Sequence, residues 1–194
     1  MKHAHAAHSV LPHSTHGFAH PVRNVAALMI EPGMVVADFG SGSGAYVLAI
    51  AEVLSGNGKV YAVDVQKDLL RRTLNEANKR GLKDVHILWG DLEKPEGSKL
   101  SGHSCDLVLI SNLLFQVEDK MRVFREAKRI VRPRGRLAVI DWQESYGGMG
   151  PIKEHLVDKD EVVALAERVG FKFADEFNAG AHHYGLVFRV VTPT

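Results

Sequence analysis

The chain has 194 residues, of which 45% are hydrophobic and 24% are charged, a balance typical of one globular domain. Its 24 basic and 23 acidic residues give a net charge of +1, which argues against a nucleic-acid-binding surface. A single cysteine, Cys105, excludes an internal disulfide and a multi-cysteine metal site. No apolar run has the length of a membrane span and no signal-peptide pattern begins the chain, so a cytoplasmic protein is expected.

Six histidines separated by small residues fall within the first twenty positions. Such a tract is typical of a flexible terminus, although histidine-rich tracts can also bind metal ions. The irregular spacing of the histidines favours the flexible terminus, and no metal site is expected. We therefore expect residues 1–20 to form a flexible segment and residues 21–194 to form one domain.

The predicted elements alternate between helices and strands along the chain. Helices are expected over residues 21–30, 46–54, 69–80, 118–131 and 158–169, where apolar residues recur at helical spacing. Strands are expected over 34–39, 59–64, 84–89, 106–111, 137–142, 171–177 and 184–191. Between them lie a polar loop at 94–103, a turn at 132–136 and a long loop at 143–157.

This order of elements predicts the fold class. The first five strands are joined by long connections, mostly helical, which implies a parallel sheet wound by right-handed crossovers. The last two strands are joined by a short connection, which makes them antiparallel. We expect an α/β fold with a Rossmann-like doubly wound sheet of about seven strands, mostly parallel, with an antiparallel C-terminal hairpin strand.

The stretch 35–46 carries the main motif of the chain. An apolar run of strand character is followed by three glycines at alternate positions, Gly40, Gly42 and Gly44, and then by a helical pattern. Glycines allow the backbone to approach a ligand closely, and the start of a helix presents unpaired N–H groups. The motif therefore predicts a site for a ligand of nucleotide size.

Two cofactor types fit this turn. With Ala45 at its third position, the turn matches the dinucleotide fingerprint, so a nicotinamide-dependent oxidoreductase is one alternative. Two acidic residues favour a different ligand. Asp38 ends the first strand, where it can face a cationic amino group, and Asp64 ends the second. The chain also lacks a Tyr-x-x-x-Lys pair.

At these residues the sequence resembles the class I S-adenosylmethionine-dependent methyltransferases, whose first motif is an acidic residue followed by Gly-x-Gly-x-Gly. The resemblance extends through Asp64, Gly90-Asp91 and the final hairpin, and covers residues 21–191. It is closest to the small methyltransferases of the ubiquinone/menaquinone-biosynthesis-like (type 11) group. One departure is Arg134, which stands where the family usually has a glycine.

The resemblance implies S-adenosylmethionine as cofactor, S-adenosylhomocysteine as product, and a set of cofactor-binding residues. The residues implied at the methionine portion are Asp38, Gly40, Ser41, Gly42 and Gly44, with Ser111 and Asn112 near the amino group. Asp64, followed by Val65, is implied at the ribose, and Asp91 with Leu92 at the adenine.

The implied reaction transfers a methyl group from a sulfonium centre. Because this electrophile is already activated, the protein mainly supplies alignment and a dry site. A base is needed only if the acceptor has a proton to lose. The candidates are His155, His182, His183 and Tyr146, and none of them is assigned a catalytic role.

The acceptor is expected to be a small or apolar molecule that the sequence does not identify. A single cysteine argues against arsenite, and Leu113-Leu114-Phe115 after Asn112 replaces the Pro-Pro-Tyr of methyltransferases that act on DNA bases or glutamine. The basic helix at 118–131 has no interleaved aromatic residues, so nucleic acid is not expected as a partner. A non-catalytic S-adenosylmethionine-binding module is a second alternative.

Overall fold

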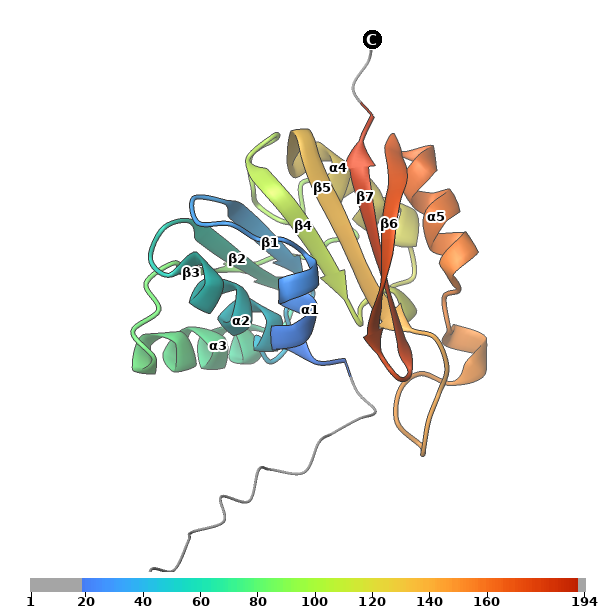
Figure 1. Cartoon of the computed structure of the whole chain (residues 1–194), viewed down its shortest axis with the longest axis horizontal. Helices are drawn as coiled ribbons and strands as arrows, with labels where there is room; N and C mark the ends of the chain where they lie inside the picture. Colours follow the sequence, from blue (N-terminus) through green and yellow to red (C-terminus); the bar gives the residue numbers. More distant parts are fainter. Residues whose placement is uncertain (1–18, 192–194) are drawn as a thin grey trace, which may run out of the picture.

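The computed structural model describes residues 19–191, so the expected flexible segment lies almost entirely outside the described residues. Its centre is a seven-stranded sheet of order β3-β2-β1-β4-β5-β7-β6 (Figure 1). The strands are β1 (Val35–Phe39), β2 (Lys59–Asp64), β3 (Val85–Trp89), β4 (Cys105–Ser111), β5 (Val131–Trp142), β6 (Phe171–Gly180) and β7 (His183–Val190).

The expected fold class is confirmed. Strands β1 to β5 pair in parallel, while β7 is antiparallel to both of its neighbours, β5 and β6. The chain first forms β6 as the outermost strand of the sheet, and it then returns as β7 between β5 and β6. The hairpin therefore contributes one antiparallel strand within an otherwise parallel sheet.

Helices cover both faces of the sheet. On one face lie α1 (Pro21–Ala27), α2 (Ala45–Leu54) and α3 (Lys67–Lys79), and on the other lie α4 (Lys120–Ile130) and α5 (Lys159–Arg168). The short 3₁₀ helices are η1 (Leu114–Gln116) and η2 (Lys153–His155). Burial on both faces explains the nearly unbroken apolar run of β4, since a parallel strand covered on both sides has no solvent face.

Helix boundaries differ from the predicted ones by a few residues, and local capping explains why. Asp119 accepts a hydrogen bond from the Arg122 backbone N–H at 3.1 Å, so α4 begins at Lys120 and not at residue 118. At the other end of the chain, α1 stops at Ala27 because Met29 adopts a left-handed conformation, with φ +47°. The prediction of a helix through residue 30 was wrong.

The predicted turn at residues 132–136 is also wrong, because these residues lie within β5 as an irregularity. The register with β4 pairs Cys105 with Val131 and Leu107 with Arg136, so β5 contains three extra residues there. The Arg132 Nη1 donates to the two carboxylate oxygens of Asp106, at 2.7 and 2.8 Å. A Cβ on Gly135 would lie 2.7 Å from the Val131 side chain, which explains a glycine at the bulge.

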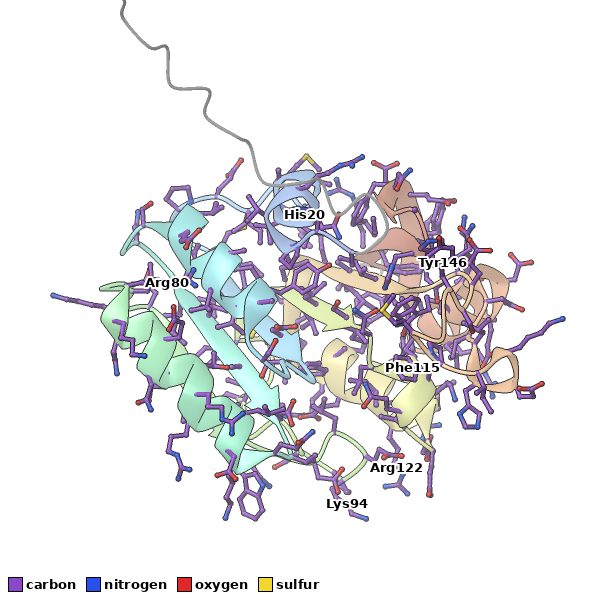
Figure 2. All side chains as sticks on the ribbon, turned by 90° about the horizontal axis from the view of Figure 1, so that it is seen from below. His20, Arg80, Lys94, Phe115, Arg122 and Tyr146 are labelled. Atoms are coloured by element: carbon purple, nitrogen blue, oxygen red, sulfur yellow. The ribbon has the colours of Figure 1, made fainter. Side chains whose placement is uncertain are left out.

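The carboxyl ends of the parallel strands meet at one edge of the sheet, at the bottom of Figure 1 and facing the viewer in Figure 2. His20 and Tyr146 lie on one side of this edge and Lys94 and Arg122 on the other (Figure 2). Cys105 is fully buried, and burial raises the pKa of its thiol to about 11, so it packs as an apolar residue. Within residues 19–191, none of the helices has both the length and the apolar character of a transmembrane span.

Candidate cofactor site

The glycine turn after β1 is built from left-handed backbone. Gly40, Gly42 and Gly44 have φ values of +69°, +51° and +79°, which side chains rarely tolerate. The backbone N–H groups of Gly40 and Ser41 donate to the Val63 carbonyl at 2.9 and 3.1 Å. The turn is therefore anchored to the end of β2.

The three glycines differ in what surrounds them. A Cβ on Gly44 would lie 2.4 Å from the Thr73 side chain, so this glycine allows α2 to pack against α3. A Cβ on Gly40 would lie 2.7 Å from Leu113. At Gly42 the nearest atom would be the Gly40 carbonyl oxygen, 3.9 Å away. Gly42 thus leaves open space above the turn, whereas Gly44 lines neither of the cavities described next.

Two cavities meet at this turn and share Gly40, Gly42 and Gln116. The first, of about 210 Å³, is lined by the apolar residues Val65, Leu92, Leu113 and Val117 and by the acids Asp64, Asp91 and Glu93. The second, of about 320 Å³, is lined by Asp38, Ser41, Tyr46, Ser111 and Asn112, with Ala19 and Pro21 at its rim. One cavity suits a nucleoside and the other suits a small polar group.

Asp64 ties the end of β2 to the glycine turn. Its Oδ2 accepts a hydrogen bond from the Gly42 backbone N–H at 2.8 Å, and its Oδ1 accepts one from the Gln66 N–H at 2.8 Å. Each carboxylate oxygen keeps a second lone pair. The buried carboxylate can therefore accept hydrogen bonds from the hydroxyl groups of a ligand while it keeps its hydrogen bonds to the turn.

Asp38 is a buried acid with unusual electrostatics. Its side chain is only 2% exposed, and burial together with the negative charge of Asp64 raises its pKa to about 8. Around it, the Ser41 Oγ and the Asn112 Oδ1 are buried and form no hydrogen bond with any residue in the range 19–191, and the buried Ser111 hydroxyl lies beside the Tyr46 hydroxyl. This polar cradle favours a ligand that brings a positive charge and hydrogen-bond donors.

The segment after β4 is held in place by β5. Asn112 adopts φ +50°, a strained value for a residue other than glycine, and its N–H donates to the Ile140 carbonyl at 2.9 Å. The buried Asp141 accepts hydrogen bonds from the backbone N–H groups of Leu114 at 3.1 Å and Trp142 at 2.8 Å. Burial raises the pKa of Asp141 to about 6. The ends of β4 and β5 therefore form one rigid wall.

The predicted site residues therefore lie together, with Gly44 set slightly apart. Asp91 is half-buried, and its Oδ1 accepts from the Glu93 N–H at 3.0 Å. Sequence reasoning missed several lining residues, among them Tyr46, Gln66, Glu93, Leu113, Gln116 and Val117. Leu113, Gln116 and Val117 follow β4, within or beside η1. From the sequence, this segment was considered only because Leu113-Leu114-Phe115 differs from a Pro-Pro-Tyr motif.

The four base candidates line neither cavity. His155 is exposed in η2. His182 contacts Glu144 at 2.9 Å and stacks on Tyr146, with ring centroids 4.1 Å apart. His183 is buried against Trp142, and burial lowers its pKa to about 4, which keeps the ring neutral at physiological pH. The geometry assigns no general base.

Comparison with known proteins agrees with this geometry. Residues 30–169 match the family described as a methyltransferase domain. The chain belongs to this family. The cofactor that fits its paired cavities is S-adenosylmethionine, because the cavity with apolar residues and three acids suits adenosine and the cavity around Asp38 suits an amino acid.

Several relatives of this methyltransferase-domain chain are known. A demethylmenaquinone methyltransferase from Bacillus cytotoxicus is 27% identical over 113 residues, which cover 58% of this chain and 46% of that protein. A nocamycin O-methyltransferase from Saccharothrix syringae is 32% identical over 109 residues, covering 56% and 38%. The crystal structure of an S-adenosylmethionine-dependent methyltransferase from Aquifex aeolicus superposes with a TM-score of 0.79 at 27% identity, covering 88% and 89%. The matched part of the curated relatives is less than half of their length.

Proposed function

We propose that this protein transfers the methyl group of S-adenosylmethionine to a small or apolar acceptor, and that residues 21–194 carry the activity. The observation that supports this most is the pair of cavities joined at Gly42, one with apolar residues and three acids and one polar around a buried acid. Their linings suit the two halves of this cofactor.

When bound, the cofactor supplies a sulfonium methyl that needs no further activation. The residues of this chain bind the cofactor and orient it toward the acceptor. Asp38 would pair with the ammonium group. Asp64 would accept hydrogen bonds from the ribose hydroxyls, and Asp91 and Leu92 would contact the adenine. The wall formed by the ends of β4 and β5 keeps water from the reacting centre.

The alternative of a nicotinamide cofactor is disfavoured by Asp38. A dinucleotide would place a pyrophosphate at the glycine turn, beside the acid Asp64 and next to Asp38, which is 2% exposed, carries no positive charge in either protonation state and becomes a second negative charge above its pKa of about 8. Both cofactors would use Asp64 at a ribose, so Asp38 is the residue that separates them. A titration in which NAD binds more tightly than S-adenosylhomocysteine would contradict the proposal.

The proposed acceptor is based on the loop beside the carboxyl ends of the strands. The loop at 143–157 exposes Tyr146, Met149 and Ile152 there, which supports an acceptor with apolar surface. The named acceptors of two relatives, demethylmenaquinone and nocamycin, are small organic molecules. The buried Cys105 thiol argues against arsenite. We propose a small-molecule acceptor, no nucleic-acid partner and a cytoplasmic location.

A methylation screen tests the proposal directly. The protein is incubated with methyl-labelled S-adenosylmethionine and with pools of small molecules, and in parallel with RNA. We expect label in small-molecule products and none in RNA. Label in RNA alone would contradict the acceptor proposal, and tight binding of S-adenosylhomocysteine with no transfer to any pool would favour the binding module.

Cofactor affinity is expected to depend on pH through Asp38. Its pKa of about 8 lies above the ordinary value of 3.8, so the group is protonated at neutral pH and must lose its proton to pair with an ammonium group. Affinity for S-adenosylhomocysteine should therefore rise by about tenfold per pH unit up to about pH 8 and then level off. The same shift lowers the stability of the ligand-free protein as the pH rises from about 4 to 8.

Calorimetric titration between about pH 6 and pH 9 measures this dependence. The Asp38→Asn variant keeps the shape of the side chain but has no proton to lose, so its affinity should be low and independent of pH. Adenosine, which lacks the amino group, should bind both proteins with the same flat profile. A flat profile for S-adenosylhomocysteine with the unmodified protein would contradict the proposed pairing.

A further inference from the structure

Asn24 connects three elements from a buried position in α1. It is 1% exposed, and its Nδ2 donates hydrogen bonds to the Tyr46 hydroxyl oxygen at 2.9 Å and to the Ala179 carbonyl oxygen at 2.9 Å. Tyr46 begins α2 beside the polar cavity, and Ala179 lies in β6, 155 residues away from Asn24 in the sequence. The amide has two hydrogens, and both are used.

The direction of the first hydrogen bond determines where the Tyr46 proton can point. Asn24 is the donor, so the Tyr46 oxygen is the acceptor and its own O–H remains to be placed. The Asn24 Oδ1 is buried and forms no hydrogen bond within the described range 19–191, so it does not receive this proton. The remaining direction is the polar cavity, which Tyr46 lines together with Asp38 and with Ser111, whose hydroxyl interacts with the Tyr46 hydroxyl at the cavity wall.

Tyr46 is suited to act as a donor there. It is 8% exposed, and burial raises the pKa of its hydroxyl, so the proton is retained at physiological pH. An amino-acid ligand has two charged groups, and Asp38 can pair only with the ammonium. A fixed hydroxyl donor in the same cavity offers a partner for the carboxylate.

We propose that Asn24 is a positioning residue that aims the Tyr46 hydroxyl at the carboxylate of the amino-acid portion of the cofactor. Tyr46 is then a cofactor contact, and Asn24 acts through it without touching the ligand. This inference rests on the cofactor placement proposed above. It assigns a role to two residues that lie outside the acidic and glycine motifs.

The test compares two ligands that differ only at this end. S-adenosylhomocysteine carries the amino-acid group, and 5′-methylthioadenosine does not. Tyr46→Phe should weaken S-adenosylhomocysteine by about tenfold to a hundredfold, the range of one hydrogen bond to a charged group, and leave 5′-methylthioadenosine unchanged. Tyr61→Phe is the matched control, because Tyr61 lies in β2 beside His86 and lines neither cavity.

Asn24→Asp tests the positioning role with almost no change of shape. An aspartate at this position accepts a hydrogen bond, so it draws the Tyr46 proton away from the cavity. It should reproduce the ligand-selective loss of Tyr46→Phe. Because Asn24 acts through Tyr46, the double variant Asn24→Asp/Tyr46→Phe should bind S-adenosylhomocysteine as the Tyr46→Phe variant does.

Binding of both ligands and the melting temperature are measured for every variant. Equal losses for the two ligands, in step with a lower melting temperature, would show that the pair is only structural and would overturn the inference. Unchanged binding in Tyr46→Phe, with Asp64→Ala weakening both ligands, would overturn it while leaving the cofactor placement intact. If the unmodified protein binds neither ligand, the proposed function itself fails.

Discussion

Replacing Gly42 with leucine is expected to abolish cofactor binding and to leave the protein folded. A Cβ at this position has no protein atom nearer than 3.9 Å, so the new side chain enters the space shared by the two cavities. Gly42 also has φ +51°, which costs a residue with a side chain about 1–2 kcal/mol. Calorimetry with S-adenosylhomocysteine should show at least a hundredfold loss of affinity, with a circular dichroism spectrum like that of the unmodified protein.

The matched control is Gly81→Leu. Gly81 has a similar left-handed conformation, with φ +72°, and nothing lies within 4 Å of the Cβ it would gain. It follows α3 and lines neither cavity, so this variant carries the same backbone strain without entering the site. It should lose stability as Gly42→Leu does and keep its affinity. Equal affinities for the two variants would mean that the turn at Gly42 does not face the cofactor.

Asp64→Ala is expected to weaken S-adenosylmethionine and S-adenosylhomocysteine by about a hundredfold or more. Two hydrogen bonds to a charged acceptor are worth roughly 1.5–3 kcal/mol each, and water recovers part of this loss. The structure adds a second cause, because the same carboxylate holds the N–H groups of Gly42 and Gln66. Adenosine should be weakened as well, since it carries the same ribose.

Asp84→Ala separates the cofactor role of Asp64 from the general loss of a buried carboxylate. Asp84 is also buried, and its Oδ2 accepts a hydrogen bond from the Gly56 backbone N–H at 2.9 Å. It precedes β3, however, and so lies at the amino ends of the parallel strands, away from the proposed site. This variant should be less stable and bind the cofactor normally. If both variants lose affinity to the same degree, the effect at Asp64 arises from stability and not from contact with the ribose.

The sequence alone was sufficient for the fold class and for placing most of the proposed site residues at one edge of the sheet. Strand ends are local features, and the carboxyl ends of parallel strands meet at one edge, so Asp38, Asp64 and Asp91 could be placed together without coordinates. The alternate glycines marked the turn for the same local reason. The single antiparallel strand also followed, because a short connection makes the last two strands antiparallel, whereas the order of the strands in the sheet came only from the structure.

What needed the tertiary structure depends on residues far apart in the chain. Gly44 was grouped with the ligand-facing glycines, yet its missing Cβ makes room for Thr73 of α3. The raised pKa of Asp38 comes from burial and from the neighbouring strand, neither of which spacing along the chain reveals. Asn24 belongs to no motif, and Tyr46 could be placed from the sequence only as the start of the helical pattern after the glycine turn. Their hydrogen bonds exist because α1 packs between α2 and β6, and only the folded chain brings these elements together.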